Sequence, residues 1–89
     1  DNDTANAVST CIPVLVNEGI IEGVKHISFK DLKNVTFNYQ NRLDVICGTT
    51  DDFEKKIKFF YQAINSKSLT ENSRGTIDLS VPGQAVYDP

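Results

Sequence analysis

Few side chains in this sequence could carry out chemistry, and they do not form a catalytic set. Asp51 and Asp52 are adjacent, so on a helix they point about 100° apart and do not face each other as a carboxylate pair. We interpret them as a helix N-terminus, where negative charge is favourable. His26, the only histidine, lies in an alternating segment typical of a solvated strand position. The sequence therefore predicts no catalytic residue, no metal ligand set and no cofactor.

The two cysteines, Cys11 and Cys47, are the remaining reactive groups. Neither has an activating partner nearby in the sequence, and the spacing fits no zinc site. Both lie at positions predicted to face the core, and two interpretations remain. They are either buried free thiols or one disulfide, which would close a loop of about 35 residues and stabilise the fold by about 3–4 kcal/mol in the chain-entropy model. The disulfide requires an oxidising compartment.

Length and charge limit the function classes further. The 89 residues (9.9 kDa) suffice for one domain, and 39% hydrophobic with 24% charged residues is typical of a globular chain. A net charge of −3 argues against binding to nucleic acid or to an anionic membrane. No apolar run approaches the roughly 20 residues that span a bilayer. Because the chain begins with Asp1 rather than Met, we expect a processed product or a piece of a longer protein.

The first element expected is a helix over about residues 4–18, ended by Gly19. Pro13 interrupts its hydrogen-bonding pattern, so the helix is expected either to bend there or to start late, with Ser9 or Thr10 as its cap. Its apolar positions recur at helical spacing and predict a buried face. They are Val8, Cys11, Ile12 and Leu15.

Alternating segments predict the strands. Residues 24–29 form a short one, and residues 35–39 and 43–47 form a hairpin with Asn41 in a left-handed conformation at its turn. Residues 76–81 predict a further strand, which Pro82 interrupts before residues 85–87 resume it at a sheet edge or bulge. The side chains expected to face the core are Val35, Phe37, Tyr39, Leu43, Val45, Cys47, Ile77, Leu79 and Val81.

A second helix is expected over about residues 51–66. Thr49 stands three residues before Asp52, which predicts a capping box with Asp in place of Glu, and Glu54 is spaced to pair with Lys58. The element order is then α-β-β-β-α-β, which favours the α+β class: a small antiparallel (mixed) sheet with two helices packed on one face. The apolar stripe of this helix comprises Phe53, Ile57, Phe60 and Ile64.

Two surfaces could bind a partner. The C-terminal segment 81–87 is apolar, and an exposed edge is a template for strand addition, although Pro82 could equally make that edge inert. The second expected helix carries three closely spaced lysines, Lys55, Lys56 and Lys58. They form either a solvated basic face or a docking site for an acidic partner.

The order of these motifs resembles the C-terminal β domain of the FtsQ/DivIB family of bacterial cell-division proteins. The resemblance covers about residues 4–89. It rests on the hairpin that ends in Val-Ile-Cys-Gly (45–48), the helix with Lys56-Ile57, and the closing Gly-Thr-Ile-Asp-Leu-Ser (75–80) followed by Ala-Val-Tyr (85–87). Ser80 stands where the family often has Arg. Pro82 and the two cysteines also depart from the family pattern.

The resemblance implies a single extracytoplasmic β domain, residues 1–89, of a protein whose transmembrane helix and POTRA domain precede it. Such proteins are not enzymes. They are divisome scaffolds that bind the membrane proteins FtsB (or DivIC) and FtsL, and so support septum assembly in bacterial cell division. The parent protein would be anchored by one helix, with this domain on the extracytoplasmic face of the membrane at the division septum. Neither nucleic acid nor a small-molecule substrate is expected as a partner.

Carried over residue by residue, the family's strand-addition site falls on the last strand and its basic contact on Lys56. Two alternatives remain. An extracytoplasmic ligand- or peptide-binding module of another family would be favoured by a pocket lined by Phe53, Phe60 and Tyr61. A hydrolase would be favoured by a strongly perturbed Asp51 or His26 in a cleft. The strand-site residues are Val81, Gly83, Ala85, Val86 and Tyr87.

Overall fold

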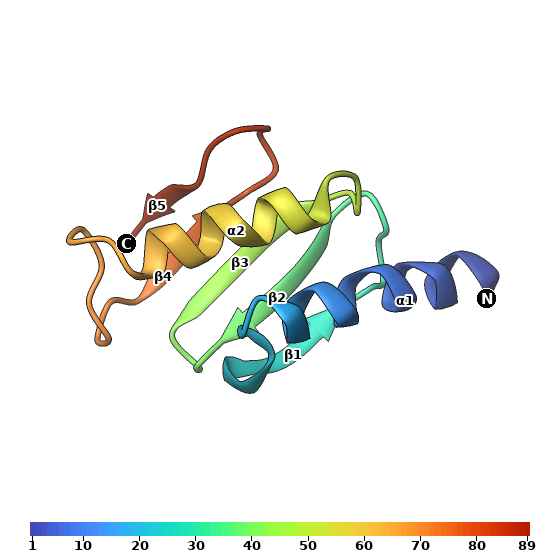
Figure 1. The fold of residues 1–89 in the computed structure, drawn as a ribbon, viewed down its shortest axis with the longest axis horizontal. Helices are drawn as coiled ribbons and strands as arrows, with labels where there is room; N and C mark the ends of the chain where they lie inside the picture. Colours follow the sequence, from blue (N-terminus) through green and yellow to red (C-terminus); the bar gives the residue numbers. More distant parts are fainter.

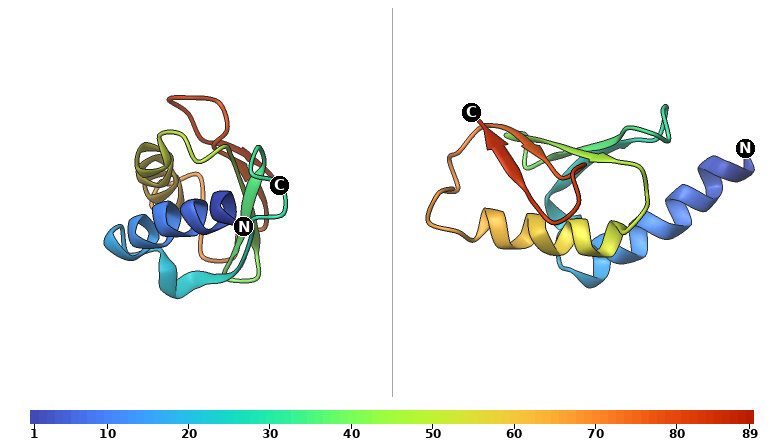
Figure 2. Two further views of the ribbon diagram at one scale, coloured as in Figure 1. Left: turned by 90° about the vertical axis from the view of Figure 1, so that its right-hand side faces the viewer. Right: turned by 90° about the horizontal axis from the view of Figure 1, so that it is seen from above.

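The computed structural model describes residues 1–89 as two layers, with both helices packed on one face of a five-stranded sheet (Figures 1 and 2). The strand order is β1-β2-β3-β4-β5; β3 and β4 are parallel, and the other neighbours are antiparallel. The α+β class and the order α-β-β-β-α-β are confirmed. The elements are α1 (Asn2–Asn17), a 3-10 turn (Ile21–Gly23), β1 (Val24–Ser28), β2 (Val35–Tyr39), β3 (Leu43–Gly48), α2 (Phe53–Ile64), β4 (Gly75–Asp78) and β5 (Val86–Asp88).

Helix α1 begins earlier than expected and continues through Pro13. Asp1 caps it, because its carboxylate accepts a 2.8 Å hydrogen bond from the Thr4 amide. Neither Ser9 nor Thr10 is the cap. Pro13 lies on the exposed side of the helix, where water can bind the carbonyl that proline leaves without a partner. The buried face is rotated from the expected stripe, so Val8 is 37% exposed. The buried residues of α1 are Ala7, Cys11 and Leu15.

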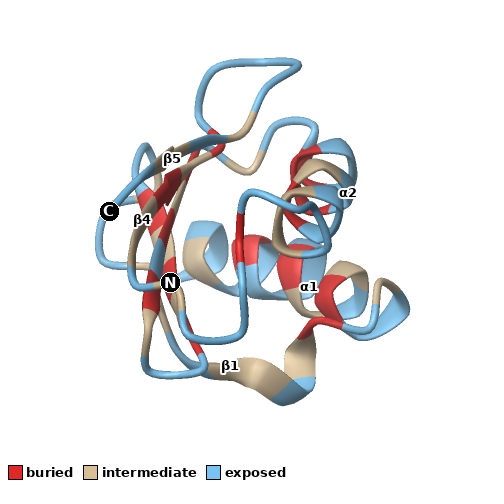
Figure 3. Cartoon of the chain, turned by 90° about the vertical axis from the view of Figure 1, so that its left-hand side faces the viewer, coloured by how far each residue is buried: buried red, intermediate tan, exposed pale blue.

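The β2–β3 hairpin confirms the sequence prediction closely. Its register pairs Phe37 with Val45 and Tyr39 with Leu43, and all six side chains expected to face the core are buried. Gln40 and Asn41 both have positive φ (56° and 58°) in the turn, which was expected only of Asn41. The hairpin thus supplies one wall of the hydrophobic core. Figure 3 shows buried residues on the sides of the sheet and of the two helices that face each other.

Helix α2 crosses from β3 to the parallel strand β4 and lies over the hairpin. Phe60 stands edge-on to Phe37 and Tyr39, with ring centroids 5.5 Å and 5.1 Å away. The predicted capping box is wrong. Asp52 is the N-cap but has a left-handed backbone (φ 54°) and makes no side-chain cap bond, while the Thr49 hydroxyl accepts instead from the Asp51 amide at 3.3 Å.

The C-terminal strands form a separate hairpin instead of one interrupted strand. Strand β4 ends at Asp78, and β5 turns back to pair with it, with Tyr87 opposite Ile77. Val81 was expected to face the core but is 51% exposed, because it lies in the connecting loop. The last strand is at the sheet edge, as predicted.

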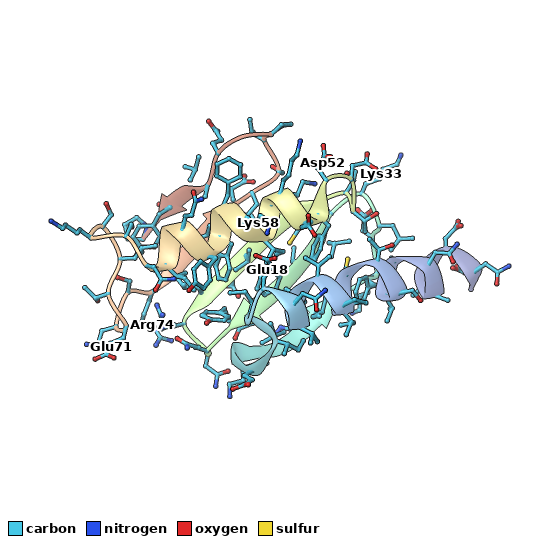
Figure 4. The ribbon with its side chains drawn as sticks, in the orientation of Figure 1. Glu18, Lys33, Asp52, Lys58, Glu71 and Arg74 are labelled. Carbon is cyan, nitrogen blue, oxygen red and sulfur yellow. The ribbon has the colours of Figure 1, made fainter.

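One ion pair joins the two helices. Lys58 Nζ lies 3.0 Å from Glu18 Oε2, and Figure 4 shows the two side chains meeting between α1 and α2. The expected ion pair between Glu54 and Lys58 does not form, because the ammonium group of Lys58 is paired with Glu18 instead. The hydrogen bond from Lys58 to Glu18 raises the pKa of the lysine.

Candidate partner-binding surface

Five of the six predicted partner-binding residues lie in the β4–β5 loop and in β5, the strand at the open edge of the sheet. Val81 and Gly83 are in the exposed loop between β4 and β5, and Ala85 leads into β5. Val86 points outward and is 48% exposed, while Tyr87 is half-buried. These five residues lie within seven consecutive positions, so their closeness follows from the chain itself, and their role in binding stays a prediction.

The backbone of residues 81–85, which turns at Pro82 and Gly83, does not pair with a neighbouring strand. No main-chain N–H or C=O of residues 81–85 makes a hydrogen bond to another main-chain or side-chain group of the protein. The loop is fixed instead at its start, where the Asp78 carboxylate accepts from the Ser80 amide at 2.8 Å and from the Ser80 hydroxyl at 2.6 Å. These free groups can accept and donate hydrogen bonds to an added chain.

Tyr87 is held more firmly than its sequence position suggests. Its hydroxyl donates a hydrogen bond of 2.5 Å to the main-chain carbonyl of Arg74, and its ring packs against the core. The structure gives Tyr87 a second role, because its hydroxyl fastens the edge strand to the segment that precedes β4.

Lys56, the sixth predicted residue, is largely buried. Its side chain is only 8% exposed, and its ammonium group donates a 2.8 Å hydrogen bond to the Thr49 carbonyl. The sequence contains a signal for this burial. Lys56 follows Phe53 by three residues and precedes Phe60 by four, so it shares their buried face. The exposed cation beside the edge segment is Lys55.

A groove lies between the N-terminal half of α2 and the β4–β5 loop. Its volume is about 550 Å³. The segment before α2 contributes Thr49, Asp51 and Asp52, and α2 contributes Lys55, Lys56 and Phe59. The chain after β4 contributes Leu79, Ser80, Pro82, Gly83 and Gln84. In Figure 1 the loop rises beside this end of α2, and Figure 4 shows Asp52 there. Sequence reasoning assigned Asp51 and Asp52 to a helix terminus but did not predict that the loop would lie across from them.

The pocket that would have favoured a ligand-binding module is absent. Phe53 and Phe60 belong to the packed core, and Tyr61 is 50% exposed on the surface of α2. None of these three side chains lines a cavity.

The reactive groups are dispersed. His26 is exposed on β1, at the opposite edge of the sheet from β5, while Asp51 and Asp52 are exposed at the start of α2. No three histidine, cysteine, aspartate or glutamate side chains are grouped to hold a metal ion.

Cys11 and Cys47 are both fully buried free thiols, contributed by α1 and β3. Burial raises the pKa of Cys11 to about 11. Burial, and then the neighbouring Cys11, raise the pKa of Cys47 to about 12. Both side chains are therefore protonated at neutral pH, and neither is an activated nucleophile.

Comparison with known proteins finds no match among protein-family models, curated proteins or solved structures. Neither helix of the chain has the length and apolar character needed to cross a membrane.

Proposed function

We propose that this chain is a non-catalytic scaffold domain of the FtsQ/DivIB type, which binds extracytoplasmic segments of FtsB/DivIC-like and FtsL-like membrane proteins by edge-strand addition. The observation that carries the proposal is the open edge of β5 together with the unpaired backbone of residues 81–85. Strand addition uses main-chain hydrogen bonds for affinity and side-chain contacts for selection, and this segment offers both.

The two edges of the sheet differ in a way that favours β5. Strand β1 carries a bulge between Val24 and His26 and an exposed Lys25, both of which discourage pairing with another chain. Strand β5 is regular, and the apolar Val86 is exposed on it. Pro82 lies in the loop before β5, so its missing N–H does not interrupt the strand itself.

An acidic partner would meet Lys55 rather than Lys56. Lys55 is exposed on α2 and lines the groove beside the edge segment, whereas Lys56 is bound to the Thr49 carbonyl. A charge pair at such a rim position contributes to orientation and to the association rate more than to affinity.

The wider setting of the proposal follows the sequence resemblance. The parent protein would be a single-pass membrane protein with a POTRA domain before this one. The domain would act outside the membrane at the division septum, within the divisome. It would act in the cell cycle through protein–protein interaction alone, with no substrate, cofactor or nucleic acid.

A second candidate function has an observation of its own. The 550 Å³ groove is within the roughly 300–1,000 Å³ range of small-ligand pockets, which favours an extracytoplasmic ligand- or peptide-binding module of another family. Titration of the domain with a partner peptide and with small-molecule mixtures separates the two functions.

The decisive experiment is a titration of residues 1–89 with the extracytoplasmic segment of the FtsB/DivIC-type protein from the same organism, followed by backbone NMR. We expect shifts confined to residues 81–88 and the N-terminal half of α2, with His26 on the opposite edge unchanged. If high micromolar segment causes no shift, the FtsL-type chain is added. If the two chains together also cause no shift, the proposal is wrong.

A further inference from the structure

Strand addition along β5 would leave the neighbouring groove between α2 and the β4–β5 loop unoccupied. The loop that forms one wall of the groove leads directly into β5, so the groove lies at the N-terminal end of the proposed binding edge. An added chain that runs antiparallel to β5 and continues past Ala85 arrives at this loop. The groove is thus the next surface that such a chain meets.

The groove has a small apolar part between the helix and the loop. Phe59 of α2 is half-buried and Pro82 of the loop is exposed, so these two side chains can contact an added apolar side chain, whereas Leu79 lies beneath them in the core. Burying one aliphatic or aromatic side chain there is the kind of anchor that dominates protein interfaces.

Two unpaired carboxylates line the groove at the start of α2, beside Lys55 and Lys56. Asp51 and Asp52 are both exposed, neither carboxylate accepts a hydrogen bond, and the only ion pair in the chain is that of Glu18 with Lys58. A basic side chain that reaches these two aspartates would pair with them, while Lys55 in the same groove would pair with an acidic one.

We propose that the partner chain continues from its strand on β5 into this groove, where it buries one apolar side chain against Phe59 and Pro82 and places a lysine or arginine beside Asp51 and Asp52. The inference rests on the proposed function and adds a second contact of opposite charge. Lys55 would face acidic groups of the partner, and the aspartates would face a basic one. This alternation would fix the register of the bound chain as well as its affinity.

The test measures the Kd of the same FtsB/DivIC-type segment by calorimetry for Phe59→Ala and for the double variant Asp51→Asn, Asp52→Asn. We expect each to weaken binding about fivefold to tenfold, since loss of an anchor exceeds about 1 kcal/mol. The loss for the double variant should shrink in high salt.

Two matched variants serve as controls. Glu54→Gln removes an exposed acid from the first turn of α2, and Tyr61→Ala removes an exposed aromatic ring from the same helix. Neither residue lines the groove, so both should bind within about twofold of the wild type, as expected of side chains outside an interface.

The outcomes separate this inference from the proposed function. If the wild-type chain binds and β5 resonances shift, but the groove variants bind as tightly as the controls, the inference is wrong and the edge-strand proposal stands. If shortening the partner segment beyond its strand abolishes the effect of the groove variants, the inference is supported. If the segment does not bind at all, even with the FtsL-type chain present, both are wrong.

Discussion

The ammonium group of Lys56 lies 2.8 Å from the main-chain carbonyl of Thr49, on the inner side of α2 and not on its surface. The contact ties the helix to the loop that follows β3. The positive charge of Lys56 also acts on the buried thiols of Cys11 and Cys47, where it opposes the larger rise in pKa that burial causes. A residue that the sequence resemblance assigns to partner binding is therefore part of the structure of the domain itself.

Replacing Lys56 should therefore weaken the fold. Lys56→Ala removes the bond to the Thr49 carbonyl and the packing of the aliphatic stem, and we expect a loss of about 1–3 kcal/mol in the free energy of unfolding. Urea unfolding measures this, with Lys55→Ala as the matched control, expected within about 0.5 kcal/mol of wild type because that side chain is exposed. Equal losses in the two variants would contradict the structural role.

Lys55 should instead govern the rate of association. Lys55→Glu reverses an exposed charge beside the proposed binding edge, so we expect the association rate constant with the FtsB/DivIC-type segment to fall severalfold at low salt, with a smaller effect at high salt. Stopped-flow fluorescence measures it. Lys67→Glu, on the loop after α2 and away from the groove, is the control. A rate equal to wild type at low salt would remove Lys55 from the interface.

The buried thiols should make stability fall in alkaline solution. The folded-state pKa values, about 11 for Cys11 and about 12 for Cys47, lie above the value of about 8.5 for an exposed thiol. The unfolded chain therefore releases its thiol protons at a lower pH than the folded chain does. The contribution of the protonated thiols to the free energy of unfolding is complete below about pH 8.5, and it is lost as the pH rises through the folded-state pKa values. In this pH range, each thiol lowers the free energy of unfolding by up to about 1.4 kcal/mol for each pH unit.

Urea unfolding between pH 7 and 11 measures this slope. The wild type also contains Tyr39 and Lys58, whose raised pKa values act in the same direction, so the comparison with Cys11→Ala/Cys47→Ala isolates the thiols. We expect a shallower alkaline decline in the double variant. Equal slopes, or fast reaction of the native thiols with a disulfide reagent at pH 8, would show that the cysteines are not buried as free thiols.

The sequence predicts best where one periodic pattern decides the structure. The β2–β3 hairpin alternates strictly between Val35 and Tyr39, and its core-facing side chains are those predicted. The stripe of Phe53, Ile57 and Phe60 likewise predicted the buried face of α2. In the hairpin, a change of register would expose several apolar side chains at once, and in α2 a rotation of the helix would do the same. Packing against the rest of the domain therefore permits only one orientation of each element.

The ends of elements were harder to predict because tertiary structure decides them. The Thr49–Asp52 spacing indicates a capping box, yet Asp52 takes a left-handed conformation, and the Thr49 carbonyl is bound by Lys56. The sequence likewise predicts one part of the candidate site but not the other. The edge segment follows from its place in the chain, whereas the groove depends on how the β4–β5 loop stands against α2, which no local pattern encodes.

Tyr87 should contribute to both stability and binding, and two variants separate these roles. Tyr87→Phe removes only the hydroxyl that bonds the Arg74 carbonyl, so we expect a loss of about 0.5–1.5 kcal/mol in the free energy of unfolding and faster amide exchange in β5. Tyr87→Ala also removes the ring and should weaken binding of the FtsB/DivIC-type segment by at least about 1 kcal/mol. Calorimetry on both variants, with Tyr61→Ala as the exposed-tyrosine control, measures the binding. If Tyr87→Ala binds as tightly as the wild type, Tyr87 is not an anchor, and its role is confined to holding β5 on the sheet.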